Sequence, residues 1–358
     1  MNILSWIMAV FSVLGALDRI FGNRFGLGKQ FEKGFHFFGI MALSMIGMIV
    51  LAPGIAQILR PGALWLYETC GIDPSVIPAF LFANDMGGAS LSKELAANEG
   101  IGMFNALVVS SMMGCTISFT IPVALEAVAE TKHRYVLLGF LCGIVTIPVG
   151  CFAGGLLCGI PLGLLLWNLL PLVIFSALIG CGLLFCPDVC VKVFRVFGKF
   201  MKILITLGLV LGVWRFLTGM EVFPGLDSLE NGAAICVNAS VVMSGAFPLM
   251  HLVSRVLARP MKALGRKLSV NETSAMGFVA TLATSMTTYE MMGDMDDKGV
   301  TLNSAFAISA AFTFAGHLAF TMAFDSAYIL PTIAGKLVAG VTSLFAAWFV
   351  YKRTAKNA

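Results

Sequence analysis

Two short polar stretches interrupt an otherwise apolar chain, and each carries side chains that could bind a small solute. Residues 83–90 read Ala-Asn-Asp-Met-Gly-Gly-Ala-Ser, and residues 283–290, which lie 200 positions further along, read Ala-Thr-Ser-Met-Thr-Thr-Tyr-Glu. Between the hydrophobic segments of a membrane protein, such polar groups are tolerated only around a buried site. Polar interruptions at corresponding positions of two halves of a chain indicate the binding site of a transporter.

The first stretch carries the main candidate for substrate binding, Asp85. An ionisable group at membrane depth is costly unless it faces a cavity or a partner, so Asp85 could be the counter-ion of a cationic substrate. Asn84 and Ser90 would supply polar contacts beside it. In the alternative interpretation, Asn84 or Asp85 caps the helix that begins at Met86.

The second stretch offers a second set of candidates. Glu290 and Tyr289 could complete a cage around a cation, one by its charge and the other by its ring face, or Glu290 could be solvated at the mouth of the site. Four hydroxyl side chains could bond a substrate or a coupling ion, or could bond their own helix backbone: Thr284, Ser285, Thr287 and Thr288.

Three polar side chains outside these stretches are further candidates. Asn105 and Asn303 occupy matching places near the starts of long predicted helices, where an amide could bond an unwound loop or cap the helix. His317 lies in the middle of an apolar segment. Its imidazole could bind substrate or carry a proton, or it could be a core histidine with satisfied hydrogen bonds.

Enzyme signatures such as HExxH, GxSxG and a P-loop are absent from the sequence. An acidic run resembles a magnesium or calcium cluster, although a solvated interhelical loop explains it better: Asp294, Asp296 and Asp297, followed by Lys298. The nine cysteines include no CxxC pair and lie mainly in apolar runs, as buried small side chains do. We therefore expect a protein that is not an enzyme and that binds no metal and no cofactor.

The composition places the chain in a membrane. Its residues are 58% hydrophobic and only 12% charged, and the mean hydropathy is +0.92, whereas about a quarter of residues are charged in soluble domains. The long apolar runs predict helices rather than outer-membrane strands. The net charge of +4 comes from basic residues at segment ends, so a nucleic-acid partner is not expected.

Eleven apolar segments are candidates for crossing the lipid bilayer, and two of them, 78–92 and 275–292, are shorter than the roughly 20 residues that a span requires. The others are 3–17, 35–58, 102–125, 135–158, 161–186, 201–220, 232–254, 303–324 and 328–351.

Shifting the sequence by about 200 positions reveals an internal repeat. Collinear matches at offsets of 198 to 200 include Met1-x-Ile3-Leu4 with Met201-x-Ile203-Leu204, Arg60-Pro61 with Arg259-Pro260, and Asn105 with Asn303. We interpret residues 1–158 and 201–351 as two copies joined by a linker helix in 159–200, all within one transmembrane domain.

Loop charge decides how the two short segments run. If both dip into the membrane and return, every basic cluster falls on one side, as the positive-inside rule requires. These clusters lie at 19–33, 132–134, 192–202 and 255–267 and in the tail with Lys352, Arg353 and Lys356. The sequence therefore predicts an all-α polytopic membrane protein with about nine full spans and two re-entrant segments. Its N-terminus would be outside and its C-terminus cytoplasmic, and the second copy would be inverted relative to the first.

The motifs along the chain resemble those of the ethanolamine-utilisation permease family, EutH-type. The resemblance rests on Ala83-Asn84-Asp85-Met86-Gly87-Gly88, on residues 282–286 and on residues 295–312, and it covers essentially the whole chain. It implies an inner-membrane carrier that brings ethanolamine into bacteria. One position departs from the family pattern, because Gly316 stands before His317 where an acidic residue is expected.

Ethanolamine agrees with the candidate residues, since its ammonium group needs a carboxylate or an aromatic face and its hydroxyl group needs an amide or a hydroxyl. The alternatives are a secondary transporter for another small polar solute, such as an amino acid or a nucleoside, or a receptor that binds the amine. The coupling ion stays open. A homodimer is possible, because small residues on the predicted helices of 135–186 could pack against a second copy: Gly139, Gly143, Gly150, Gly154 and Gly155.

Overall fold

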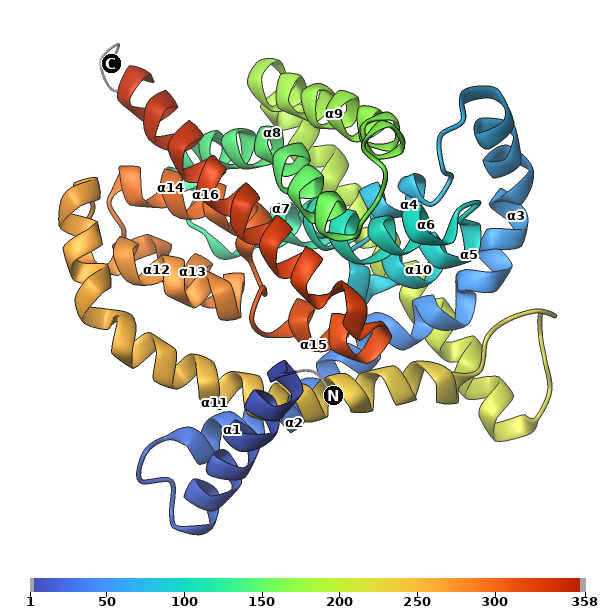
Figure 1. The fold of residues 1–358 in the computed structure, drawn as a ribbon, viewed down its shortest axis with the longest axis horizontal. Helices are drawn as coiled ribbons and strands as arrows, with labels where there is room; N and C mark the ends of the chain where they lie inside the picture. The colour runs from blue at the N-terminus through green and yellow to red at the C-terminus, as the bar shows by residue number, and fades with distance from the viewer. Residues whose placement is uncertain (1–2, 355–358) are drawn as a thin grey trace.

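The computed structural model describes residues 3–354, and within that range all regular structure is helical (Figure 1). Met1 and Lys356, which contribute to the predicted repeat and to the predicted charge of the tail, lie outside the described residues. The helices are α1 (Ile3–Ile20), α2 (Leu27–Met41), α3 (Gly47–Cys70), α4 (Val76–Leu81), α5 (Gly88–Leu95), α6 (Glu99–Phe104), α7 (Ile121–Ala127), α8 (His133–Leu157), α9 (Leu162–Phe185), α10 (Pro187–Thr218), α11 (Leu229–Leu268), α12 (Glu272–Ala283), α13 (Ser285–Glu290), α14 (Asp297–Ala310), α15 (Gly316–Phe324) and α16 (Ile329–Thr354).

Eight continuous helical stretches among the described residues are long and apolar enough to cross a membrane, which confirms a polytopic membrane protein. Two of these stretches combine several helices: Leu27–Cys70 joins α2 and α3, and Glu99–Ala127 joins α6 and α7 through π-helical turns at Asn105–Gly114 and Thr116–Thr120. Such π-helical turns are rare and frequently mark functional sites.

Residues 303–324, predicted as one continuous span, instead form parts of two helices, α14 and α15. The chain between them pairs with the end of α12, since Phe312 N donates to Thr281 O at 3.1 Å and Phe314 N donates to Leu282 O at 2.9 Å. Phe312 adopts a left-handed conformation with φ of 62°. These bonds satisfy backbone groups that the interrupted helix leaves free, so the break is possible at membrane depth.

A hairpin comprises residues 73–98, and its two ends are tied together. The Asp73 carboxylate accepts hydrogen bonds from Ala97 N at 3.1 Å and from Asn98 N at 2.7 Å, where the chain turns into α6. It also accepts from Ser75 N at 3.0 Å and from Ser75 Oγ at 2.5 Å. The segment that contains α4 and α5 therefore starts and ends at the same place, as a re-entrant element must. We call it the first hairpin.

The second hairpin, residues 271–296, is closed in the same way. Asn271 N donates to Asp296 Oδ1 at 3.2 Å, and Asn271 Nδ2 donates to Asp294 O at 2.7 Å. The Asp296 carboxylate also accepts from Ser274 Oγ at 2.7 Å. The acidic run at 294–297 thus closes this hairpin, whose arms are α12 and α13.

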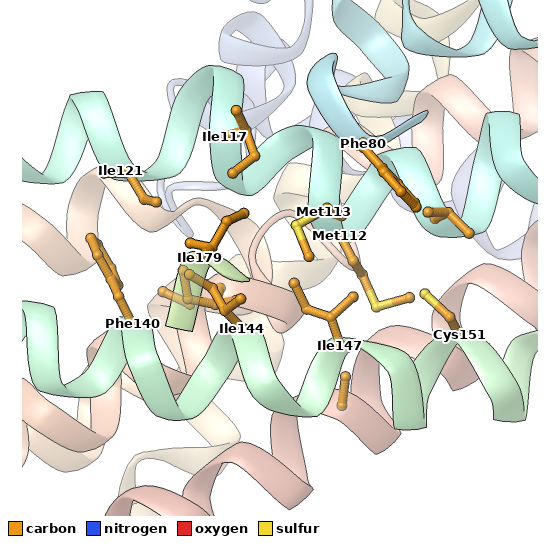
Figure 2. Close-up of a cluster of buried hydrophobic side chains, with 14 of the residues drawn as sticks. Phe80, Met112, Met113, Ile117, Ile121, Phe140, Ile144, Ile147, Cys151 and Ile179 are labelled. Atoms are coloured by element: carbon orange, nitrogen blue, oxygen red, sulfur yellow. The ribbon is translucent and has the colours of Figure 1, made fainter. Parts of the chain in front are cut away.

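The largest hydrophobic cluster lies between the Glu99–Ala127 stretch and α8. Figure 2 shows Met112, Met113 and Ile117 on one side of this cluster and Phe140 and Ile144 on the other. Helix α8 also packs against α14 and α16, while α1 and α2 pack along α11 in a separate group (Figure 1). The core therefore holds the helix that follows the first hairpin in a fixed place.

The glycines of α8 serve this packing within the chain. A Cβ atom added to Gly139 would lie 2.3 Å from Thr301 O, and one added to Gly150 would lie 2.3 Å from Gly335 O. These glycines let α14 and α16 approach the α8 backbone closely. The face that could have packed against a second copy is thus occupied by helices of the same chain.

Candidate functional site

The tip of the first hairpin is a break between α4 and α5. Phe82 is extended, with φ of −122° and ψ of 135°, and a single 3₁₀ turn follows at Asn84–Met86. Gly87 then takes the left-handed conformation with φ of 92°, and a Cβ atom there would lie 2.5 Å from the Met48 side chain. The Gly87-Gly88 pair is therefore required for the chain to turn against α3 and enter α5.

Two polar side chains lie at this tip, Asn84 without a hydrogen-bond partner and Asp85 without an ion-pair partner. Asn84 is 1% exposed, and neither its Oδ1 nor its Nδ2 has a hydrogen-bond partner. Asp85 is half-buried and belongs to none of the ion pairs found among residues 3–354. Buried polar groups in folded proteins are nearly always hydrogen-bonded, so an unpaired amide beside a carboxylate points to a ligand or to water.

The backbone of the tip, in contrast, is held by side chains from the π-helical part of the Glu99–Ala127 stretch. Ser110 Oγ donates to Phe82 O at 2.7 Å, and Ser118 Oγ accepts from Ala83 N at 3.1 Å. Gly114 lies against the same turn, because a Cβ atom there would be 1.9 Å from Phe82 O. The main chain of the tip is thus fixed while the Asn84 side chain stays unbonded.

A buried lysine that the sequence analysis missed lies on the other side of this stretch. Lys336, in α16, is 1% exposed, and its Nζ donates to Ser111 O at 2.8 Å. It interacts electrostatically with Asp85 and with His317. The sequence analysis used basic residues only to orient loops, whereas a lone lysine inside the apolar run 328–351 is itself a signal of a functional site.

His317 is at the start of α15, directly after the break in 311–315. It is 1% exposed, its Nδ1 has no hydrogen-bond partner, and its ring lies 5.3 Å from the Phe312 ring between centroids. The 3₁₀ turn at Asn84–Met86 packs against α15. The tip of the first hairpin therefore meets the interrupted helix of the other half of the chain.

The tip of the second hairpin is more fully bonded within itself. Thr284 Oγ1 caps α13 by accepting from Met286 N at 3.3 Å. The hydroxyl groups of Thr288 and Thr281 are 2.8 Å apart, and Thr288 also donates to Gly277 O at 3.2 Å. These contacts follow the alternative interpretation, in which the hydroxyl groups bond their own hairpin. Thr287 is half-buried, and nothing in its contacts selects it as a ligand.

Tyr289 and Glu290 lie in different surroundings. Tyr289 is 1% exposed in the largest hydrophobic cluster, and its hydroxyl and that of Ser285 lack partners at hydrogen-bonding geometry. Glu290 is exposed at the end of α13. Helix α13 packs against α7, whereas the first tip packs against α15. The structure thus brings Asn84, Asp85 and His317 together with Lys336 and leaves Glu290 in the solvated position.

Asn105 and Asn303 lie on the helices that follow the two hairpins, away from the tips. Asn105 Nδ2 donates to Ser75 Oγ at 2.8 Å, and Asn303 Nδ2 donates to Ser274 O at 2.8 Å and to Gly299 O at 3.0 Å. Each amide therefore ties the start of a hairpin to the helix that follows it. The Oδ1 atom of each has no partner.

Two cavities adjoin elements that contact the first tip. One, of about 310 Å³, adjoins α5 toward the closed end of the hairpin and is lined by Ser90, Lys93, Glu94, Asp227 and Asn231 among others. The other, of about 660 Å³, is at the far end of the stretch and is lined by Ser118, Glu126, Arg195, Lys199 and Lys202 among others. Ser118, which lines the second cavity, also bonds Ala83 of the tip. A larger cavity of about 760 Å³ between α8 and α9 contains none of the candidate residues.

Comparison with known proteins identifies the family of the chain. The sequence pattern of the family described as "Ethanolamine utilisation protein, EutH" matches residues 1–350. The chain is 43% identical over 356 residues to the probable ethanolamine permease EutH of Listeria monocytogenes, covering 99% of this chain and 95% of that protein. It is 41% identical over 381 residues to the protein of that name in Escherichia coli, covering 96% and 93%. No solved structure matches. The chain therefore belongs to the EutH family of ethanolamine utilisation proteins.

Proposed function

We propose that this protein is a permease of the bacterial inner membrane that takes up ethanolamine, and that Asp85 is the counter-ion of the substrate ammonium group. The substrate is taken from the relatives, which are named as probable ethanolamine permeases. The observation that carries the site is the half-buried Asp85 beside an Asn84 side chain with no partner, in a hairpin whose Ser90 lines one cavity and whose Ala83 bonds Ser118 of another.

The chemistry of the tip is suited to ethanolamine. The amine resembles a lysine side chain, with a pKa of about 10.4, and so it is a cation at neutral pH. A carboxylate binds an ammonium group by charge-assisted hydrogen bonds, and a primary amide can both donate to and accept from a hydroxyl group. Asp85 and Asn84 are adjacent in sequence and offer both functions at one place.

The proposal includes an inverted repeat of residues 1–158 and 201–351. Corresponding residues 198 or 199 positions apart support it: Asn105 and Asn303 each bond the start of a hairpin, at Ser75 and Ser274. The cavity lined by Arg195, Lys199 and Lys202 would face the cytoplasm under the positive-inside rule. The other cavity would face outward, so that the first tip controls access from both sides. The N-terminus would then be external and the C-terminus cytoplasmic.

The test is uptake of labelled ethanolamine into liposomes that contain the purified protein, with and without a proton or sodium gradient. We expect saturable uptake by the wild type and a loss of at least a hundredfold in Asp85→Asn. The control Glu68→Gln removes an exposed carboxylate from α3 and should transport like the wild type. Wild-type uptake by Asp85→Asn would exclude the counter-ion role, and no uptake by the wild type would exclude the function.

A carrier for another small polar solute is the second candidate, and Gly316 favours it. The resemblance described above implies an acidic residue at this position, next to His317, where this chain has glycine. Competition by unlabelled solutes separates the two candidates. A cation site should be blocked by small primary amines and should ignore neutral nucleosides, whereas strong competition by a neutral solute would support the second candidate.

A further inference from the structure

We infer that the Lys336 ammonium group is the cation that balances Asp85 in the empty carrier, and that the substrate ammonium group competes with it. This inference rests on the proposed function and adds a second charged residue to the same site. In this scheme the Lys336 ammonium group takes the place of the substrate ammonium group near Asp85 when no substrate is bound. The unloaded carrier can then change back to its outward-facing state without binding a sodium ion or a proton.

The position of Lys336 is fixed by backbone contacts. Gly335, beside it in α16, lies against α8, because a Cβ atom there would be 2.8 Å from Gly150 O. Thr332, one turn earlier, donates to Leu107 O at 3.4 Å. Among the described residues, the only hydrogen bond from Lys336 Nζ is to Ser111 O. The ammonium group is therefore buried with most of its donor capacity unused, although a lysine has three donors.

The same turn of the π-helical segment contacts both the lysine and the hairpin tip. Ser111 O accepts from Lys336, and the neighbouring Ser110 Oγ donates to Phe82 O at 2.7 Å. A Cβ atom on Gly88 would lie 2.3 Å from Ser110 Oγ. A movement of the tip would therefore displace the turn at Ser110 and Ser111 and, with it, the hydrogen-bond acceptor of Lys336.

Among the described residues, only one group that interacts with Lys336 can neutralise its charge. The titratable side chains that interact with it are Asp85 at the tip, His317 of α15, Cys115 after the π-helical segment and Cys151 of α8. A histidine is neutral or cationic, and a buried thiol is a weak acid, which leaves the Asp85 carboxylate. A buried cation without an anionic partner would be costly, so the two charges require one another.

The two charged groups interact without forming a direct pair. Lys336 Nζ lies more than 4.0 Å from both carboxylate oxygens of Asp85. The carboxylate is therefore not engaged directly by the lysine. Ethanolamine carries the same primary ammonium group as lysine, so binding exchanges one such cation for another near Asp85. Loss of Lys336 should then hinder the step in which the carrier returns empty.

Comparison of exchange with net uptake tests this step. In exchange, labelled ethanolamine enters liposomes preloaded with unlabelled ethanolamine, so the carrier is occupied in both directions. In net uptake the liposomes start empty. We expect Lys336→Gln to exchange within about twofold of the wild type while net uptake falls at least tenfold. Lys352→Gln, which removes an exposed lysine from the same helix, should change neither rate. Loss of both rates in Lys336→Gln, or retention of both, would overturn the inference.

A stability measurement tests the charge pair without any substrate. Thermal unfolding of the purified protein is followed for Asp85→Asn, for Lys336→Gln and for the double variant. Each single variant leaves one charge uncompensated and should lower Tm, and the double variant should recover at least half of the combined loss. Additive losses would overturn the inference even if the wild type did not transport ethanolamine. Recovery in a protein without ethanolamine uptake would instead mean that the charge pair exists and the proposed substrate is wrong.

Discussion

The two hairpins differ at their tips but share a clasp, by which we mean the hydrogen bonds that join the two ends of a hairpin. In the first, Asp73 accepts hydrogen bonds from the backbone at Ala97 and Asn98, and in the second, Asn271 bonds Asp294 and Asp296. An asparagine on the following helix reinforces each clasp. The same way of closing a hairpin thus occurs twice, at positions about 200 residues apart.

At the tips the difference is a carboxylate. The first tip has Asp85 beside a buried Asn84 side chain without a partner, whereas the second hairpin has only hydroxyl groups there: Thr281 and Thr288 satisfy each other, and those of Ser285 and Tyr289 have no partner. An unsatisfied buried polar group destabilises a fold, so it persists where function requires it. The comparison suggests that the two hairpins have one scaffold role in common and that the first provides most of the binding chemistry.

The largest expected loss of stability comes from breaking the clasps, and the loss should be larger for the first hairpin than for the second. Asp73→Ala removes a buried carboxylate that accepts four hydrogen bonds and should cost about 3 kcal/mol of unfolding free energy. Asn271→Ala removes a helix-capping side chain that is largely exposed and should cost about 1 kcal/mol. Thermal or denaturant unfolding in one detergent measures both. Equal losses would show that the clasps are energetically equivalent.

Two nearly isosteric substitutions at the tips should have opposite effects. Asn84→Leu removes two unpaired polar groups, so stability should stay equal or rise by up to about 1 kcal/mol while ethanolamine uptake falls at least tenfold. Thr288→Val breaks its hydroxyl contacts, so stability should fall by about 1 kcal/mol while uptake stays within about twofold. Unfolding and liposome uptake on the same preparations give both values. A loss of uptake in Thr288→Val with normal uptake in Asn84→Leu would reverse the assignment of roles.

A smaller effect is expected at Gly316, where the resemblance implies an acidic residue. A Cβ atom on Gly316 would have no neighbour closer than Phe312 Cδ1 at 3.7 Å, so a side chain can start there without a clash. Gly316→Asp places a carboxylate in the first turn of α15, where the helix dipole favours it, beside His317. We expect unchanged or slightly higher stability and a few-fold lower KM for ethanolamine uptake. Gly316→Asn is the uncharged control, and an equal change in KM for both variants would show that charge is not the cause.

The fold class and both hairpins could be predicted because their signals are local. Apolar length identifies spans, and the short segments at 78–92 and 275–292 cannot cross a bilayer alone. The break at 311–315 could not be predicted, because Ala311-Phe312-Thr313-Phe314-Ala315 contains no proline, glycine or charge. It depends on hydrogen bonds to Thr281 and Leu282, which lie about 30 residues earlier.

The candidate site shows the same limit. Asn84 and Asp85 could be found from polarity alone, and Lys336 could have been found by the same criterion applied to the last apolar run. The roles of Thr288 and Asn105 could not be separated from ligand binding by sequence, because a hydroxyl or an amide looks the same whether a substrate or another part of the chain is its partner. Only the hydrogen bonds to Thr281 and Ser75 decide this.

The smallest expected effect concerns the helices that leave the two hairpins. Asp297, at the start of α14, pairs with Lys132 at 2.7 Å, and the hydrogen bond from Lys132 holds the pKa of the Asp297 carboxyl below its ordinary value of 3.8. Glu99 is the corresponding residue at the start of α6, 198 positions earlier, and is exposed. Because the pKa is lowered in the folded state, the pair stabilises the fold above the unfolded-state pKa and loses this contribution as pH falls through the folded-state pKa.

Asp297→Asn should therefore cost about 0.5 kcal/mol at pH 7 and nothing measurable near about pH 3, a small value because both partners are partly exposed to solvent and screened. Glu99→Gln should change stability at neither pH. Unfolding at the two pH values, in low salt and again in about 0.5 M salt, separates the ion pair from other effects, because screening should shrink only the Asp297 loss. A loss that persists in acid and in salt would mean that Asp297 acts through its hydrogen bonds at the helix start and not through its charge.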